Sequence, residues 1–97
     1  MTFEEFKQSL KSEAPPLQLN ELLQALWYAG KGDWEASHNI AQNIHSNDGS
    51  WIHAYLHRQE GDVSNASYWY RRAEKKMPSN AVSLEKEWEA IVIQLLD

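Results

Sequence analysis

The feature of this sequence that most constrains its fold is a Gly-Asp pair that occurs twice, 29 residues apart, as Gly32-Asp33 and Gly61-Asp62. In both copies a small residue lies seven positions before the glycine, and another lies five positions after it. Glycine can adopt the backbone conformation of a sharp turn, and aspartate can cap the helix that follows. Small residues let two helices pack closely. The pattern therefore predicts two helical hairpins with short loops.

Apolar residues recur at helical spacing along the chain, and no segment alternates cleanly at the period of a strand. Turn and capping signals, among them Pro15-Pro16, Asn47-Asp48-Gly49-Ser50 and Pro78, divide the chain into segments. We predict an all-α fold with about six helices, at roughly 2–13, 17–30, 33–46, 50–60, 62–76 and within 80–96. The last helix has two candidate caps, Ser79 and Ser83.

These segments predict a single helical domain over residues 1–97. The two hairpins would cover about 18–46 and 50–77. A hairpin of this kind cannot bury its apolar face alone. We therefore expect the helices at about 2–13 and 80–96 to cap the hairpins at both ends.

Composition excludes several classes of protein. Hydrophobic residues make up 42% of the 97-residue chain and charged residues 24%, which is typical of a folded domain. The sequence contains no cysteine, so disulfides and Cys-based zinc or redox sites are excluded. No apolar stretch is long enough to span a bilayer, and the first residues do not form a secretory signal. We therefore expect a cytoplasmic protein that does not bind membranes.

The charge of the chain is unevenly distributed. The net charge of −5 disfavours nucleic-acid binding, so we expect no nucleic-acid partner. Residues 49–76 nevertheless contain five Lys or Arg and three acids, for a local charge of +2. This basic segment is either a solvated helix face or the binding surface for an acidic partner.

Around the second Gly-Asp pair the chain resembles the tetratricopeptide repeat, through Ala54, Gly61-Asp62, Ala66, Tyr70, Ala73 and Pro78. The first unit departs from the family pattern, because Ser37 replaces the usual alanine, Ala41 replaces the aromatic residue and no proline closes the unit. The resemblance covers about residues 20–78. It implies stacked hairpins with a concave surface that can bind a peptide.

A second resemblance is narrower and covers residues 53–73. This tract is similar to a signature block in a family of small uncharacterised bacterial proteins. The matching residues are His53-Ala54-Tyr55-Leu56-His57-Arg58, Glu60-Gly61-Asp62, Asn65-Ala66 and Tyr68-Trp69-Tyr70-Arg71-Arg72-Ala73. The similarity implies a common site or common packing in this tract, but no known activity.

Two histidines form a candidate metal site. His53 and His57 are four residues apart in the predicted helix at 50–60, so their rings share a face and suit one metal ion. Glu60 or His38 could supply a third ligand. The metalloprotease motif has a glutamate directly after the first histidine, and Ala54 occupies that position here. The alternative is a pair of histidines that hydrogen-bond neighbouring helices or loops. We therefore expect no bound cofactor and keep the two histidines as metal candidates.

The orientation of these histidines is open. Apolar periodicity centres the buried arc of this helix on Trp51, Ile52, Tyr55 and Leu56, which places the histidines outward. The repeat resemblance instead places His53 and His57 inward and turns Trp51, Tyr55 and Arg58 toward a concave groove. We favour the second arrangement. The groove could also be filled by the apolar segment 90–96 of the last helix.

The helix at 62–76 carries Tyr68, Arg71, Arg72 and Lys75 on the face opposite its apolar stripe. An aromatic ring beside guanidinium groups can bind an acidic peptide, a phosphate or a nucleobase. The alternative is that Arg71 and Arg72 form ion pairs with Glu85 or Glu89 of the last helix.

The sequence shows no glycine-rich phosphate loop and no nucleophile-elbow motif, so we favour a non-enzymatic protein. The leading hypothesis is an interaction module that binds a peptide or an acidic partner surface. Two alternatives are a small-ligand or metal site, with or without catalysis, around His53, His57, Arg58 and Glu60, and a structural subunit of a homo-oligomer or larger assembly. The candidate binding residues are Trp51, His53, Tyr55, His57, Arg58, Tyr68, Arg71 and Arg72.

Overall fold

The computed structural model describes residues 1–96, and over this range the chain forms six α-helices and no strand. The helices are α1 (Phe3–Ser9), α2 (Glu21–Gly30), α3 (Trp34–Ala41), α4 (Asn47–Gln59), α5 (Val63–Ala73) and α6 (Leu84–Leu95). The predicted all-α fold with about six helices is therefore confirmed. None of these helices is both long and apolar enough to cross a membrane.

Each helix begins at a side chain whose oxygen accepts a hydrogen bond from a backbone N–H of the first turn. The capping residues are Thr2, Asn20, Asp33, Ser46, Asp62 and Ser83. Thr2 and Glu5 form a reciprocal capping box at α1. Between the two predicted candidates for α6, Ser83 is the cap. Because Asn20 sets its start, α2 begins a few residues later than predicted, whereas α6 lies within the predicted range.

The predicted turn at Asn47-Asp48-Gly49-Ser50 is wrong, because these residues form the first turn of α4. The Ser46 side chain caps the helix by accepting a hydrogen bond from the Gly49 N–H at 3.1 Å. Glycine at position 49 allows α4 to pack closely against Ile44 and does not form a turn. A Cβ atom at this position would collide with the carbonyl oxygen and side chain of Ile44.

Three helices end earlier than predicted, and each has a local reason. α1 ends at Ser9, because the next three residues form i→i+3 hydrogen bonds, and the Lys31 ammonium then binds two carbonyl groups of this segment. α3 ends at Ala41, because the next residues form the tighter i→i+3 hydrogen bonds of a 3₁₀ turn. α5 ends at Ala73, because Glu74 adopts a left-handed conformation with φ of 59°.

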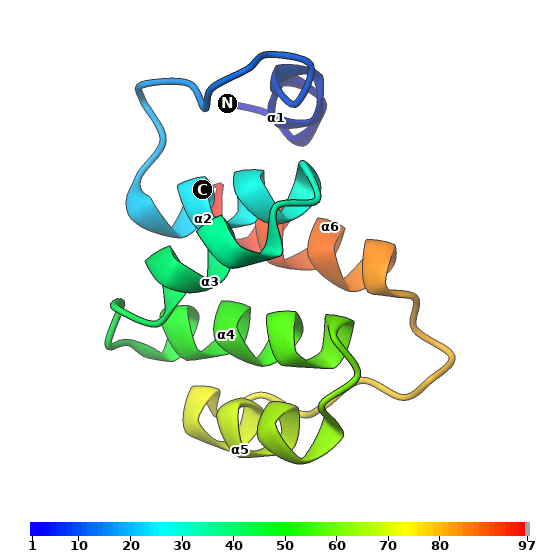
Figure 1. The fold of residues 1–97 in the computed structure, drawn as a ribbon. Helices are drawn as coiled ribbons and strands as arrows, with labels where there is room; N and C mark the ends of the chain where they lie inside the picture. The colour runs from blue at the N-terminus through cyan, green and yellow to red at the C-terminus, as the bar shows by residue number, and fades with distance from the viewer. Residues whose placement is uncertain (97) are drawn as a thin grey trace.

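The two Gly-Asp pairs form the predicted corners. Gly32 and Gly61 have φ of 84° and 87°, a region that glycine occupies readily. Asp33 and Asp62 then cap α3 and α5. Each corner turns the chain back, so that α2 packs against α3 and α4 packs against α5. Figure 1 shows the resulting stack, in which α2 to α5 follow one another from top to bottom.

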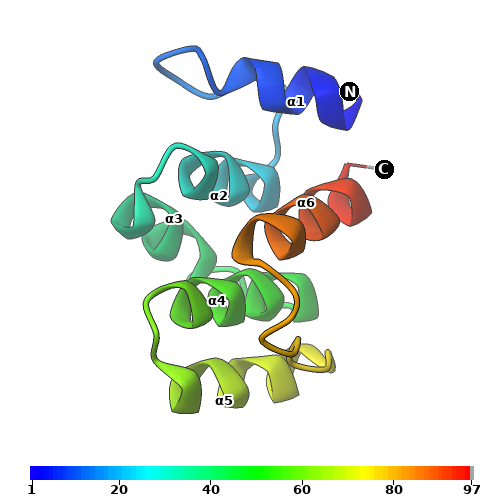
Figure 2. The same cartoon turned by 90° about the vertical axis from the view of Figure 1, so that its right-hand side faces the viewer.

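α6 folds back across this stack and lies against α2 and α4, while α1 lies across the end near α6 (Figures 1 and 2). Trp88 of α6 is buried there, and its indole N–H donates to the Leu26 carbonyl at 2.9 Å. The main core forms where these helices meet, from residues such as Phe6, Leu26, Trp27, Ile52, Leu56, Ile91 and Val92. A smaller cluster of Ala54, Ala66 and Tyr70 lies between α4 and α5.

Candidate functional site

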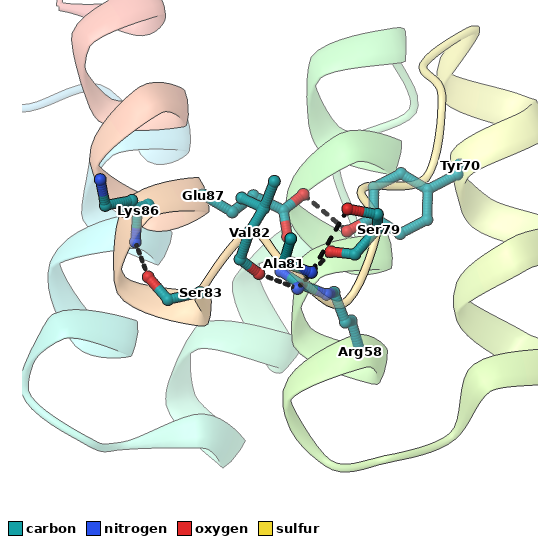
Figure 3. Close-up of polar contacts among 8 residues, drawn as sticks. All are labelled: Arg58, Tyr70, Ser79, Ala81, Val82, Ser83, Lys86 and Glu87. Atoms are coloured by element: carbon teal, nitrogen blue, oxygen red, sulfur yellow. Dashed lines mark hydrogen bonds and ion pairs between the residues drawn. The ribbon is translucent and has the colours of Figure 1, made fainter.

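The buried carboxylate of Glu87 connects three helices (Figure 3). Its Oε1 accepts a hydrogen bond from Arg58 Nη1 of α4 at 2.8 Å, and its Oε2 accepts one from the Tyr70 hydroxyl of α5 at 2.6 Å. Glu87 is only 4% exposed, so these two strong bonds replace its lost hydration. Burial, together with the bond to Glu87, raises the pKa of Tyr70, which keeps its hydroxyl protonated as a donor.

Arg58 also ties down the segment that precedes α6. Its Nη2 donates to the carbonyl groups of Val82 and Ser79. Figure 3 shows this segment passing over the guanidinium group. Since its donors are engaged by the protein itself, Arg58 is a structural residue that holds α6 on α4.

Tyr55 is likewise unavailable to a partner. The repeat resemblance places it in an open groove, whereas it is 4% exposed and belongs to the main core. Burial raises its pKa to about 12. α6 packs on α4 here, so the groove expected from Trp51, Tyr55 and Arg58 is filled by the last helix, as its apolar sequence allows. Trp51 and Arg58 remain partly exposed, and the Arg58 guanidinium is bonded to Glu87 and the segment before α6.

The exposed face of α5 carries the predicted aromatic and basic residues. The Arg72 guanidinium lies 5.4 Å from the ring centre of Trp69 and 5.9 Å from that of Tyr68. Arg72 Nη1 also donates to the Tyr68 hydroxyl at 3.2 Å, and Arg71 Nη1 donates to Ser67 Oγ at 3.0 Å. Between residues 1 and 96 neither arginine forms an ion pair, which contradicts the alternative pairing with Glu85 or Glu89. α5 packs mainly against α4, and its contact with the first turn of α6 is made by the buried Tyr70, which bonds Glu87.

An open groove of about 460 Å³ lies between the end of α5, the connecting segment and α6. We call it the lysine groove. Its wall is mostly apolar, from Trp51, Met77, Pro78, Val82 and Ala90, and its edges carry Lys75, Lys76 and Lys86. The Lys75 ammonium lies 4.3 Å from the ring centre of Trp51. Within residues 1–96 no carboxylate forms an ion pair with the three lysines.

A second cluster lies between α3 and α4 and contains His38, His53 and His57, which we call the histidine cluster. One ring nitrogen from each residue lies within 4.8 Å of the corresponding nitrogens of the other two. His38 Nε2 and His53 Nε2 are 2.9 Å apart. His57 Nδ1 lies 2.7 Å from Glu60 Oε1. The arrangement unites His53 and His57 with both predicted third ligands, and the two buried histidines face inward, as the repeat resemblance implies.

Two tryptophans flank the histidine cluster. The Trp34 ring stacks on His38 with ring centres 4.6 Å apart, and the Trp69 ring stacks on His53 at 4.0 Å. Burial in this setting, reinforced by the neighbouring imidazoles, lowers the pKa of His53 to about 4. Burial also lowers the pKa of His38. These two imidazoles are therefore neutral at pH 7.

Several residues of these sites are not found by the sequence analysis. Glu87 lies at helical spacing with the apolar residues Leu84 and Ile91, and an acid on an apolar stripe is the signal that could have revealed a buried ion pair. Trp34 lies four residues before His38, so the stacking of their rings on one helix face could also have been predicted. Nothing in the sequence places Lys86 beside Lys75, because the path of the connecting segment decides it.

No protein-family model, curated protein or solved structure matches this chain. The resemblance to tetratricopeptide repeats therefore remains a prediction that rests on the Gly-Asp corners. The function has to be inferred from the two sites themselves.

Proposed function

We propose that the chain is a non-enzymatic interaction module that binds an acidic segment of a partner protein in the lysine groove. The observation that carries this proposal is the set of three lysines, without an ion-pair partner in residues 1–96, around an apolar wall. A segment with alternating acidic and apolar side chains complements such a groove in both charge and polarity.

The apolar wall provides the affinity in this proposal. Trp51 and Met77 are half-buried and already packed against the smaller core cluster, so they present fixed surfaces to a partner. Preorganised anchors of this kind lower the entropy that binding costs. Tryptophan is also enriched among the residues that contribute most to interface energies.

The charges provide attraction and specificity. The chain has a net charge of −5, yet the cations Arg71, Arg72, Lys75, Lys76 and Lys86 lie along α5, the segment after it and the start of α6. The nearby buried acid, Glu87, is neutralised by Arg58. Unpaired cations at the edge of a groove attract acidic partners and repel basic ones.

The proposed partner is of the class expected from the sequence, but the proposed binding site is the lysine groove and not the groove expected from Trp51, Tyr55 and Arg58. Tyr55 and Arg58 bind α6 instead of a peptide, whereas Trp51 lines the new groove. The proposed tetratricopeptide-like stack supports the same function, since stacked hairpins expose extended helix surfaces for partners.

A peptide titration followed by NMR tests the proposal. One probe is a peptide that alternates Glu or Asp with Leu and Phe, and the other has Lys in place of each acid. We expect the acidic peptide alone to shift the Trp51 indole and the backbone signals of residues 75–90. The affinity should fall as salt rises, because exposed charges are screened.

Paired charge variants locate the site. The K75E/K76E variant should weaken binding of the acidic peptide at least tenfold. The K7E/K11E variant changes the net charge equally at exposed positions of the N-terminal segment and should leave the affinity unchanged. Equal effects of the two variants, or equal binding of both peptides, would contradict the proposal. Light scattering of the free protein tests the alternative of a homo-oligomer in the same sample.

A further inference from the structure

We propose that the histidine cluster binds a divalent transition-metal ion, with Zn²⁺ as the best fit. Three imidazoles from α3 and α4 converge, and one nitrogen of each lies within 4.8 Å of the others. Three histidines with an open fourth position are an established zinc-binding arrangement in proteins. This site is separate from the lysine groove and shares no lining residue with it.

One of the three nitrogen–nitrogen distances is already close to that of a metal site. Zn–N bonds of about 2.0–2.1 Å in a tetrahedral site place the nitrogens roughly 3.4 Å apart. The Nε2 atoms of His38 and His53 are 2.9 Å apart, so they need to separate by only a few tenths of an ångström. In the metal-free protein the same short distance is a hydrogen bond between two imidazoles, which an ion would replace.

Glu60 completes the arrangement as an outer partner. Its Oε1 lies 2.7 Å from His57 Nδ1, at hydrogen-bond distance. When Nδ1 carries the proton and donates it to the carboxylate, Nε2 of the same ring holds a free lone pair. A carboxylate that orients a ligating histidine in this way is a common feature of zinc sites and increases the basicity of the ligand.

The surroundings hold the histidine rings in place and leave space beside them for an ion. Trp34 and Trp69 stack on His38 and His53 and restrict the rotation of both rings. His53 and Trp69 also line a cavity of about 260 Å³ that opens to solvent, which provides an entry path and room for a water as fourth ligand.

The donor set selects the kind of ion. Imidazole nitrogen suits Zn²⁺, Co²⁺, Ni²⁺ and Cu²⁺, whereas Mg²⁺ and Ca²⁺ require oxygen ligands. Three imidazole nitrogens on two packed helices, with an open fourth position, suit the tetrahedral geometry that Zn²⁺ adopts. Co²⁺ adopts the same geometry and absorbs visible light, so it can report the coordination directly.

The experiment uses the full chain, freed of metal by a chelator, and measures the binding of Zn²⁺ by calorimetry and of Co²⁺ by visible absorption. We expect one Zn²⁺ per chain and the intense absorption of four-coordinate Co²⁺. H38Q should abolish both signals. H45Q removes an exposed histidine that lines the same cavity but does not belong to the cluster of three, and it should change neither. K75E/K76E should also retain metal binding, so failure of one proposal is distinguishable from failure of the other.

Glu60 provides a test that does not disturb the core, because the residue is exposed. E60Q should weaken zinc binding about 10–100-fold, as loss of an outer partner does elsewhere. It should leave the melting temperature of the metal-free protein unchanged and alter the Co²⁺ spectrum. The proposal is overturned if the wild-type chain binds neither ion, if Co²⁺ shows the weak absorption of six-coordination, or if folded H38Q binds as the wild type does.

Discussion

At the scale of single residues, the polar side-chain atoms buried in this protein form hydrogen bonds with specific partners. The Ser37 hydroxyl donates to the Ala25 carbonyl at 2.6 Å, which explains a serine where the repeat pattern has alanine. Arg58, Glu87 and Tyr70 form a closed network between α4, α5 and α6. No buried side-chain nitrogen or oxygen in residues 1–96 lacks a hydrogen-bond partner.

The Arg58–Glu87 pair gives a prediction at this scale. R58M removes the cation and leaves the buried Glu87 carboxylate with only its hydrogen bond from Tyr70, so we expect the free energy of unfolding to fall by about 3 kcal/mol. Urea denaturation monitored by circular dichroism measures the change. R71M, at an exposed arginine, should change the same free energy by less than about 0.5 kcal/mol. Adding E87Q to R58M should recover much of the loss, and equal effects of R58M and R71M would refute the structural role of Arg58.

At the scale of helices and turns, much of the fold is predictable from sequence because capping and corner signals are local. Both Gly-Asp corners have the expected conformation, since positive φ and an aspartate cap each depend on one residue. Gly49 misleads for a physical reason. Glycine is needed at this position because any side chain would collide with Ile44, and not because the backbone has a positive φ. Sequence alone does not show that contact.

Part of the candidate site is likewise predictable from local sequence patterns, and part of it is not. The spacing of His53 and His57 on one helix predicts a shared face, and His38 is among the predicted third ligands. The occupation of the expected groove by α6 depends instead on how a connecting segment returns the chain to α2 and α4. The wall and rim of the lysine groove come from three separate segments, so no local pattern reveals it.

The corners give a prediction at the scale of elements. A Cβ atom added to Gly61 meets no atom within 4 Å, so G61A introduces only the strain of a left-handed backbone. We expect it to lower the free energy of unfolding by about 1 kcal/mol. G61N should lower it less, because asparagine tolerates this conformation better. A thermal melt of both variants measures the difference, and an unchanged G61A would mean that the corner does not need glycine.

At the scale of the whole molecule, two hairpins and the returning α6 make one stack with two separate sites. The histidine cluster exists because the hairpin corners and the α3–α4 loop bring His38 next to α4. The lysine groove exists because the chain after α5 passes over Arg58 before α6 begins. Both proposals therefore depend on the same placement of helices.

That placement is tested most directly by an NMR spectrum of the imidazole nitrogens, recorded before and after one equivalent of Zn²⁺. The chain contains four histidines, of which three form the cluster and His45 lies outside it. We predict that the nitrogen shifts of His38, His53 and His57 change together while those of His45 do not. A response of His45 alone, of all four rings equally, or of His53 and His57 without His38 would contradict the account.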